Sequence, residues 1–142
     1  MEVALQEAKI AFDKDEVPVG AVIVEGGKII AVAHNQNREL CDPSAHAEIL
    51  AIRIAGQVKN SSRLDGCDLY VTLEPCAMCA SAASLARIRR IYYAASDVKS
   101  GAVENGVKVF SSSSCHHKPE IYSGFCEEES KILLRQFFAL KR

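Results

Sequence analysis

The sequence has no tryptophan, few aromatic residues and almost no net charge. Aromatic side chains make up 6% of its 142 residues, and the formal net charge is -1. The balanced charge excludes the strongly basic composition typical of nucleic-acid-binding proteins, so any such surface must be a local patch. The chain also has no apolar run near the ~20 residues that a transmembrane helix needs. We therefore expect no membrane span.

The N-terminal segment carries Glu2 and Glu7, where a signal peptide would have basic residues. We therefore expect the protein to remain in the cytoplasm. In that reducing compartment its six cysteines are poor candidates for disulfides, and their spacing points instead to metal or catalytic sites. No internal repeat or linker is visible, and residues 1–142 have the length of a single domain.

The first half of the chain predicts a helix, a hairpin and a second helix. Leu5, Ala8 and Phe12 recur at helical spacing, and the pattern stops before Pro18. Two apolar runs, 20–24 and 29–33, flank a glycine turn and predict a β-hairpin whose first strand is buried on both faces. Residues 42–44, Asp-Pro-Ser, are typical of a helix start and predict a second helix that extends to about Gly56.

The second half alternates between strands and helices. The residue pattern predicts strands at 69–73 and 91–94, a helix from Pro75 to Leu85 and a short strand at 120–123. A final helix should carry Leu133, Phe137 and Leu140 on one apolar face. Strands that alternate with helices after an initial hairpin indicate an α/β fold, a three-layer α/β/α sandwich around a mixed five-stranded sheet.

Two segments carry metal-binding residues at the start of a predicted helix. Cys76 and Cys79 are three residues apart, so both thiols lie on one helical face and can reach one ion. His46 would be the third ligand, and three protein ligands leave one position of a tetrahedral zinc ion open, as in catalytic sites. Glu48 lies two residues beyond His46, so the two side chains can converge only at the entrance of the helix.

The cysteine pair alone leaves other interpretations open. Thioredoxin-like redox sites and structural zinc knuckles share its two-residue gap. A non-catalytic module built on structural zinc would need a fourth protein ligand, and no cysteine or histidine stands at motif spacing to provide one. It would also leave Glu48 without a role beyond that of an ordinary acid in a helical first turn. The residues therefore favour a catalytic site.

At this point the chain resembles the zinc-dependent nucleobase deaminases, and in particular bacterial tRNA-specific adenosine deaminases. The resemblance covers nearly the whole chain. It rests on the following segments: Glu16–Val22, Asn35, Asp42–Ile49, Leu69–Cys79 and Phe137-Phe138.

The resemblance implies hydrolytic deamination of adenosine to inosine at the wobble position of a tRNA anticodon, by a homodimer that binds the anticodon arm. It makes His46, Cys76 and Cys79 the ligands of one zinc ion per chain and Glu48 the catalytic proton shuttle. Val19 and Asn35 would contact the base, and Asp97, Lys99 and Phe138 would line the RNA-binding rim. The chain departs from the family at His34, where an aromatic residue is common, and at residues 94–96, where glycine is commoner.

Several assignments stay open. A deaminase of free guanine or of a cytidine-type molecule would use the same zinc core, although cytidine deaminases usually carry cysteine at the position of His46. His116 and His117 are either exposed loop residues or RNA contacts. Of Phe137 and Phe138, helical spacing puts one in the core and leaves the other free to stack on a base. The remaining cysteines have no ligand spacing and are interpreted as packed or idle thiols: Cys41, Cys67, Cys115 and Cys126.

Overall fold

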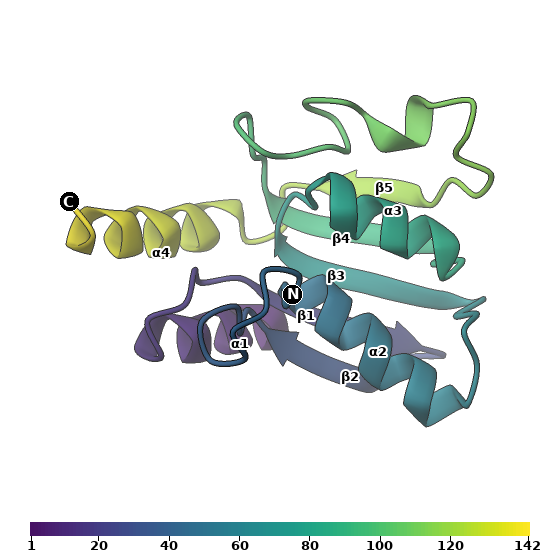
Figure 1. Ribbon diagram of the computed structural model, residues 1–142, viewed down its shortest axis with the longest axis horizontal. Helices are drawn as coiled ribbons and strands as arrows, with labels where there is room; N and C mark the ends of the chain where they lie inside the picture. The colour runs from purple at the N-terminus through teal and green to yellow at the C-terminus, as the bar shows by residue number, and fades with distance from the viewer.

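The computed structural model describes residues 1–142 as a β-sheet with helices on both faces (Figure 1). The elements follow the chain as α1 (Glu2–Asp13), β1 (Gly20–Glu25), β2 (Lys28–His34), α2 (Ala47–Lys59), β3 (Cys67–Leu73), α3 (Ala77–Leu85), β4 (Arg90–Ala95), the 3-10 turn η1 (Val109–Ser111), β5 (Glu120–Ser123) and α4 (Glu127–Leu140).

The sheet has five strands in the order β2-β1-β3-β4-β5. β1 pairs antiparallel with both β2 and β3, whereas β4 pairs parallel with β3 and β5. The predicted mixed five-stranded sheet is therefore confirmed, including the short strand at 120–123. The hairpin turns at Gly26 and Gly27, whose φ angles of 56° and 78° lie in the left-handed region that glycine adopts without strain.

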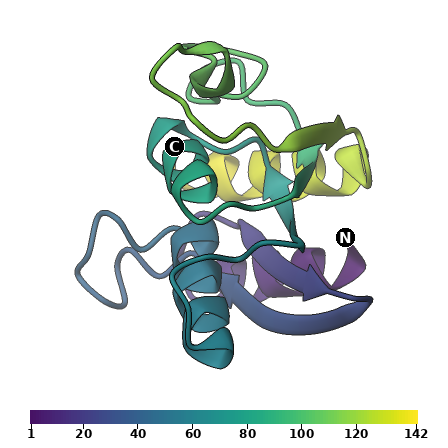
Figure 2. The same cartoon turned by 90° about the vertical axis from the view of Figure 1, so that its right-hand side faces the viewer.

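Helices α2 and α3 lie side by side on one face of the sheet, and α1 and α4 cover the other (Figures 1 and 2). Successive strand residues point to opposite faces, so Ala21 and Ile23 of β1 join the core beneath α2. On the other face, the Ser130 hydroxyl of α4 donates to the Thr72 carbonyl of β3 at 2.6 Å. Both faces of the sheet are thus packed, as predicted for a three-layer sandwich.

Two local predictions were wrong. Residues 42–44 were predicted to start the second helix, but they lie in the loop before α2, which begins only at Ala47. The Asp42 carboxylate accepts hydrogen bonds from the backbone N–H and the hydroxyl of Ser44, and it thereby forms a local turn instead of capping the helix. Leu140 is 73% exposed although helical spacing predicted it on the core face of α4. The last turn of α4 projects beyond the carboxyl ends of β3 and β4, where no sheet lies beneath it (Figure 1). Phe137, one turn earlier, is buried as predicted.

None of the helices combines the length and the apolar character that crossing a bilayer requires.

Candidate active site

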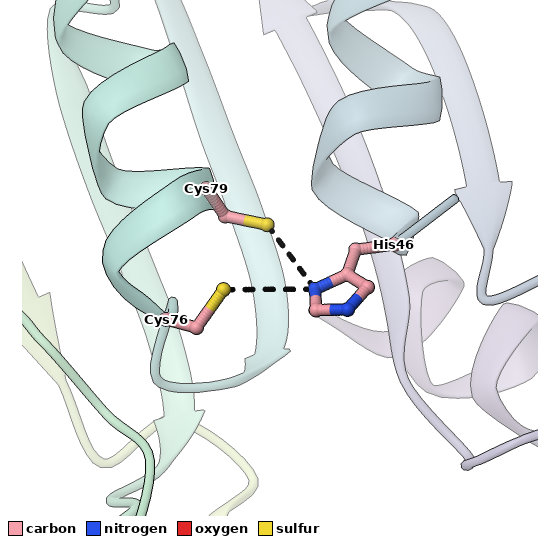
Figure 3. A group of neighbouring side chains, drawn as sticks. All are labelled: His46, Cys76 and Cys79. Atoms are coloured by element: carbon pink, nitrogen blue, oxygen red, sulfur yellow. Dashed lines mark hydrogen bonds between the residues drawn. The ribbon is translucent and has the colours of Figure 1, made fainter. Parts of the chain in front are cut away.

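His46 and Cys76 hold equivalent positions in the fold. His46 is the N-cap residue of α2 and Cys76 that of α3, and both have extended backbones, with ψ angles of 152° and 175°. An N-cap residue lies just outside the helix, so its side chain can turn toward a neighbouring element. Cys79 follows in the first turn of α3. The three side chains point into the gap between the two helix starts (Figure 3).

The geometry of these three side chains suits a tetrahedral metal ion. The Nδ1 atom of His46 lies 3.6 Å from the Cys76 sulfur and 3.4 Å from the Cys79 sulfur, and all three ligand atoms lie within 4.8 Å of one another. Zinc bonds of about 2.1 Å to nitrogen and about 2.3 Å to sulfur put tetrahedral ligand atoms ~3.6 Å apart. One imidazole nitrogen and two cysteine sulfurs also form a typical zinc donor set.

The electrostatics of the cluster favour the ligand form of Cys76. A hydrogen bond from the Cys79 thiol, with a further contribution from His46, lowers the pKa of Cys76 to about 4. Cys76 is therefore a thiolate at neutral pH, which is the form that binds zinc. The same contact with Cys76 raises the pKa of His46.

Glu48 lies in the first turn of α2 beside this cluster. Its side chain is buried, with 4% of the residue exposed, and desolvation raises its pKa to about 7. A carboxyl group with a pKa near neutrality can both accept and release a proton at neutral pH, as a general acid-base catalyst must. Because His46 stands outside the helix, the two-residue offset does not separate Glu48 from the cluster.

A cavity of about 270 Å³ opens beside the cluster and brings together most of the residues singled out in the sequence. Its volume lies just below the ~300–1,000 Å³ of ordinary small-molecule pockets, so it can hold a small ring system. The sequence-predicted residues on its wall are Val19, Asn35, His46, Glu48, Cys76 and Asp97.

Asn35 has a fixed orientation at this cavity. Its side-chain oxygen accepts the backbone N–H of Ala47, the first residue of α2, at 2.8 Å. This bond caps the helix and leaves the amide N–H₂ as the group available to a ligand, because an amide oxygen is needed to face the N–H donor. Asn35 can therefore recognise a hydrogen-bond acceptor.

A second cavity of about 860 Å³ adjoins the first and shares Val17, Leu73, Asp97 and Ser100 with it. Lys99 and Phe138 line only this larger cavity, together with Lys141 and Arg142. The Asp97 carboxylate is used within its own loop, where it accepts the backbone N–H groups of Lys99 and Ser100. In the structure, the Asp97 side chain therefore stabilises the loop that lines both cavities.

Besides the apolar Val17 and Leu73, three polar residues on the small cavity were not predicted as site residues: Asn37, Glu74 and Ser100. Of these three, only Glu74 had a sequence feature that could have indicated a place in the site, because it belongs to the Leu-Glu-Pro-Cys segment that contains Cys76. By contrast, His116 and His117 line a separate cavity of about 450 Å³ that shares no residue with the other two. All four remaining cysteines are free thiols outside the cluster.

Comparison with known proteins identifies the domain. Residues 1–95 match the family model described as the cytidine and deoxycytidylate deaminase zinc-binding region. The whole chain is 58% identical to the tRNA-specific adenosine deaminase of Agrobacterium fabrum, over 93% of that protein.

Solved structures agree with this result. One described as a study of A-to-I editing by tRNA:A34 deaminases at the wobble position of transfer RNA is 57% identical, covers 94% of this chain and 97% of its own, and superposes with a TM-score of 0.93. Guanine deaminase from Nitrosomonas europaea has a TM-score of 0.84 over 97% of this chain and 82% of its own, but at 23% identity it shares only the fold. The chain belongs to the tRNA-specific adenosine deaminases, within the zinc-binding cytidine and deoxycytidylate deaminase family.

Proposed function

We propose that this chain converts adenosine to inosine at the wobble position of a tRNA anticodon, and that residues 1–142 act as one zinc-dependent deaminase domain. The observation that carries the proposal is the His46–Cys76–Cys79 cluster beside the buried Glu48, at the base of a cavity that can hold a small ring system. The same arrangement in a chain of 58% identity to a tRNA-specific adenosine deaminase supports the substrate.

His46, Cys76 and Cys79 would hold one zinc ion per chain. Zinc in a three-ligand site supplies a Lewis acid that lowers the pKa of a coordinated water to about 7. The protein contributes the geometry: α2 and α3 fix the three ligands from two sides and leave the cavity side open to the substrate.

Glu48 is the proposed catalytic proton shuttle. It would take a proton from the attacking water and pass it to the ring nitrogen of adenine, and then take the proton of the newly added hydroxyl and pass it to the leaving amine. Its burial keeps bulk water from competing for these transfers.

Val19 and Asn35 would hold the base. Val19 offers an apolar surface on the cavity wall, and the free N–H₂ of Asn35 would donate to an acceptor on the purine. A hydrogen-bonding side chain in a fixed orientation rejects ligands that lack the matching group more strongly than an apolar contact does.

The larger cavity would receive the flanking anticodon nucleotides. Lys99 offers a positive charge to phosphates, exposed Phe138 offers a ring on which a base can stack, and Asp97 shapes the loop between them. An adenosine in a single-stranded loop is already accessible, whereas one in a stem would have to be extruded at a cost of a few kcal/mol. The anticodon arm is therefore the proposed partner.

The chain is also proposed to act as a homodimer, as the family resemblance implies. Leu85 and Val107 line the separate cavity beside α3, and they are 80% and 73% exposed in the single chain. Exposed apolar surface of this kind is common at protein interfaces. Sedimentation at several protein concentrations would test the dimer, and a monomer at micromolar concentration would contradict it.

The test of function is an inosine assay. Purified protein is incubated with a transfer RNA that carries adenosine at the wobble position, and in parallel with free adenosine, cytidine and guanine. We expect inosine in the transfer RNA and little turnover of the small molecules. A transfer RNA with guanosine at the wobble position is the matched control. Efficient turnover of free guanine or cytidine without turnover of transfer RNA would replace the proposed substrate.

A further inference from the structure

Glu74 lies at the end of β3, between Leu73 and Pro75, and its carboxylate is the most heavily hydrogen-bonded in the structure. The residue is 2% exposed. One carboxylate oxygen, Oε1, accepts from the backbone N–H of Asp97, the hydroxyl of Ser96 and the side-chain amide of Asn105. The other, Oε2, accepts the backbone N–H groups of Val103, Glu104 and Asn105 at 3.0–3.1 Å.

All six donors belong to the loop 96–105, which follows β4. This loop supplies Asp97 and Ser100 to the small cavity and Lys99 to the larger one. It is packed directly against the carboxylate, because a Cβ atom added at Gly101 would lie 2.5 Å from the Glu74 carboxyl carbon. The backbone N–H of Ala102 also donates to the Pro75 carbonyl at 2.9 Å. The segment that carries Cys76 and the RNA-facing loop are thus joined through Glu74.

These contacts depend on a carboxylate. An ionised carboxylate only accepts hydrogen bonds, so both of its oxygens match the N–H donors of the loop. A glutamine has the same shape, but its N–H₂ group would face at least two N–H groups in either orientation. A buried donor without an acceptor costs the desolvation energy of that group. The loop would then have to move away.

We propose that Glu74 is a positioning residue for the RNA substrate: its carboxylate holds loop 96–105 in the shape that presents Asp97, Lys99 and Ser100 to the anticodon. It acts through the loop, because both of its carboxylate oxygens are engaged by donors of residues 96–105. The role rests on the proposed function for its substrate. It differs from a general structural role, which would alter the amount of active enzyme but leave the affinity of the folded enzyme for transfer RNA unchanged.

The test compares Glu74→Gln with the wild-type enzyme in three measurements: steady-state kinetics on transfer RNA, zinc content and amide hydrogen exchange. Since a displacement of about 1 Å in a positioning element can cost up to ~100-fold, we expect KM for transfer RNA to rise about tenfold or more. Zinc content should stay at the wild-type level and kcat should change much less than KM. Exchange should accelerate in residues 97–105 but not in α2.

Two further variants complete the test. Asp68→Asn is the matched control, because Asp68 is a buried carboxylate at the opposite end of β3 and pairs only with Arg89. It should leave KM unchanged. Asn105→Ala removes one donor to Glu74 and should raise KM in the same direction but less, even if Glu74→Gln fails to fold. In a double-mutant cycle the two changes should be non-additive.

Each contrary result has a separate meaning. Loss of zinc, or a fall in kcat at unchanged KM, in either variant would overturn the positioning role, as would unchanged exchange in residues 97–105. A different result would refute the proposed substrate and not the contact between Glu74 and the loop. In that case the wild-type enzyme would not act on transfer RNA, while hydrogen exchange in residues 97–105 would still accelerate in Glu74→Gln and Asn105→Ala.

Discussion

Glu48 and His46 are two residues apart, an offset that in a regular helix would turn their side chains away from each other. They share one site because His46 is the N-cap of α2 and has an extended backbone, whereas Glu48 already belongs to the first helical turn. The offset thus predicts a helix entrance, and the structure confirms it. In the proposed mechanism this arrangement also separates their roles, with His46 as a metal ligand and Glu48 facing the substrate.

The proton-shuttle role of Glu48 predicts that Glu48→Ala binds zinc normally but loses activity. General acid-base groups contribute about 10²- to 10⁴-fold to the rate, so the variant should retain at most ~1% of the wild-type kcat. Single-turnover inosine formation and elemental analysis measure the two quantities. Glu128→Gln is the control, since Glu128 is an exposed carboxylate of α4. A Glu48→Ala enzyme with a tenth of the wild-type rate would contradict the role.

The ligand assignment predicts that Cys76→Ala loses most of its zinc. Two remaining ligands cannot complete a three-ligand site, and zinc bound only by the folded state contributes to its stability. The variant should therefore also melt at a lower temperature than the wild type, and a chelator should reduce that difference. Cys41→Ala is the matched control because Cys41 is an exposed free thiol. Full zinc content in folded Cys76→Ala would mean that the ligand set is wrong.

Sequence reasoning found those residues whose chemistry depends on short spacing. Cys76 and Cys79 form a pair within one helical turn, and His46 and Glu48 lie in one motif. It missed the hydrogen bonds of Glu74 because their donors are 22 to 31 residues away along the chain. Nothing in the local pattern of Glu74 indicates where a loop from beyond β4 will lie. The same limit applies to the Asn35 cap on α2, which spans 12 residues.

At the scale of elements, helical spacing predicted α4 but not how much of it the sheet covers. Phe137 is 6% exposed and packs edge-on against Phe12 of α1, with ring centroids 5.9 Å apart. Phe138 is 46% exposed and lines the larger cavity. Periodicity shows which residues share a face, but the length of that face in contact with the core depends on where the strands end. Leu140 lies beyond this limit.

The two adjacent phenylalanines should therefore have different functions. Phe137→Ala should lower the free energy of unfolding by about 3–5 kcal/mol, the usual cost of a buried phenylalanine. Phe138→Ala loses mainly its contact with Phe137, worth at most about 1.5 kcal/mol, but should weaken tRNA binding by about 1–3 kcal/mol if a base stacks on the ring. Urea unfolding and RNA binding measure the two effects. The reverse result would exchange the two roles.

At the scale of the whole molecule, the net charge of -1 gives no general attraction for RNA, so binding must depend on where the charges lie. Lys99, Lys141 and Arg142 all line the larger cavity. The ammonium group of Lys141 is paired with Asp15, which also binds Arg38. Part of the charge of Lys141 is thus already compensated, whereas Lys99 and Arg142 have no carboxylate partner and can each contact a phosphate.

A phosphate contact by Lys99 can be measured through salt. The affinity of an RNA-binding protein falls linearly with salt on a double-logarithmic scale, and each neutralised phosphate of single-stranded RNA contributes about 0.7 to the slope. Lys99→Ala should therefore weaken tRNA binding about equally for different anticodon sequences and reduce that slope by about 0.7. Lys28→Ala is the control, because Lys28 is exposed on the hairpin at the opposite end of β1 from the site. An unchanged slope in Lys99→Ala, with the control behaving as wild type, would remove Lys99 from the RNA-binding rim.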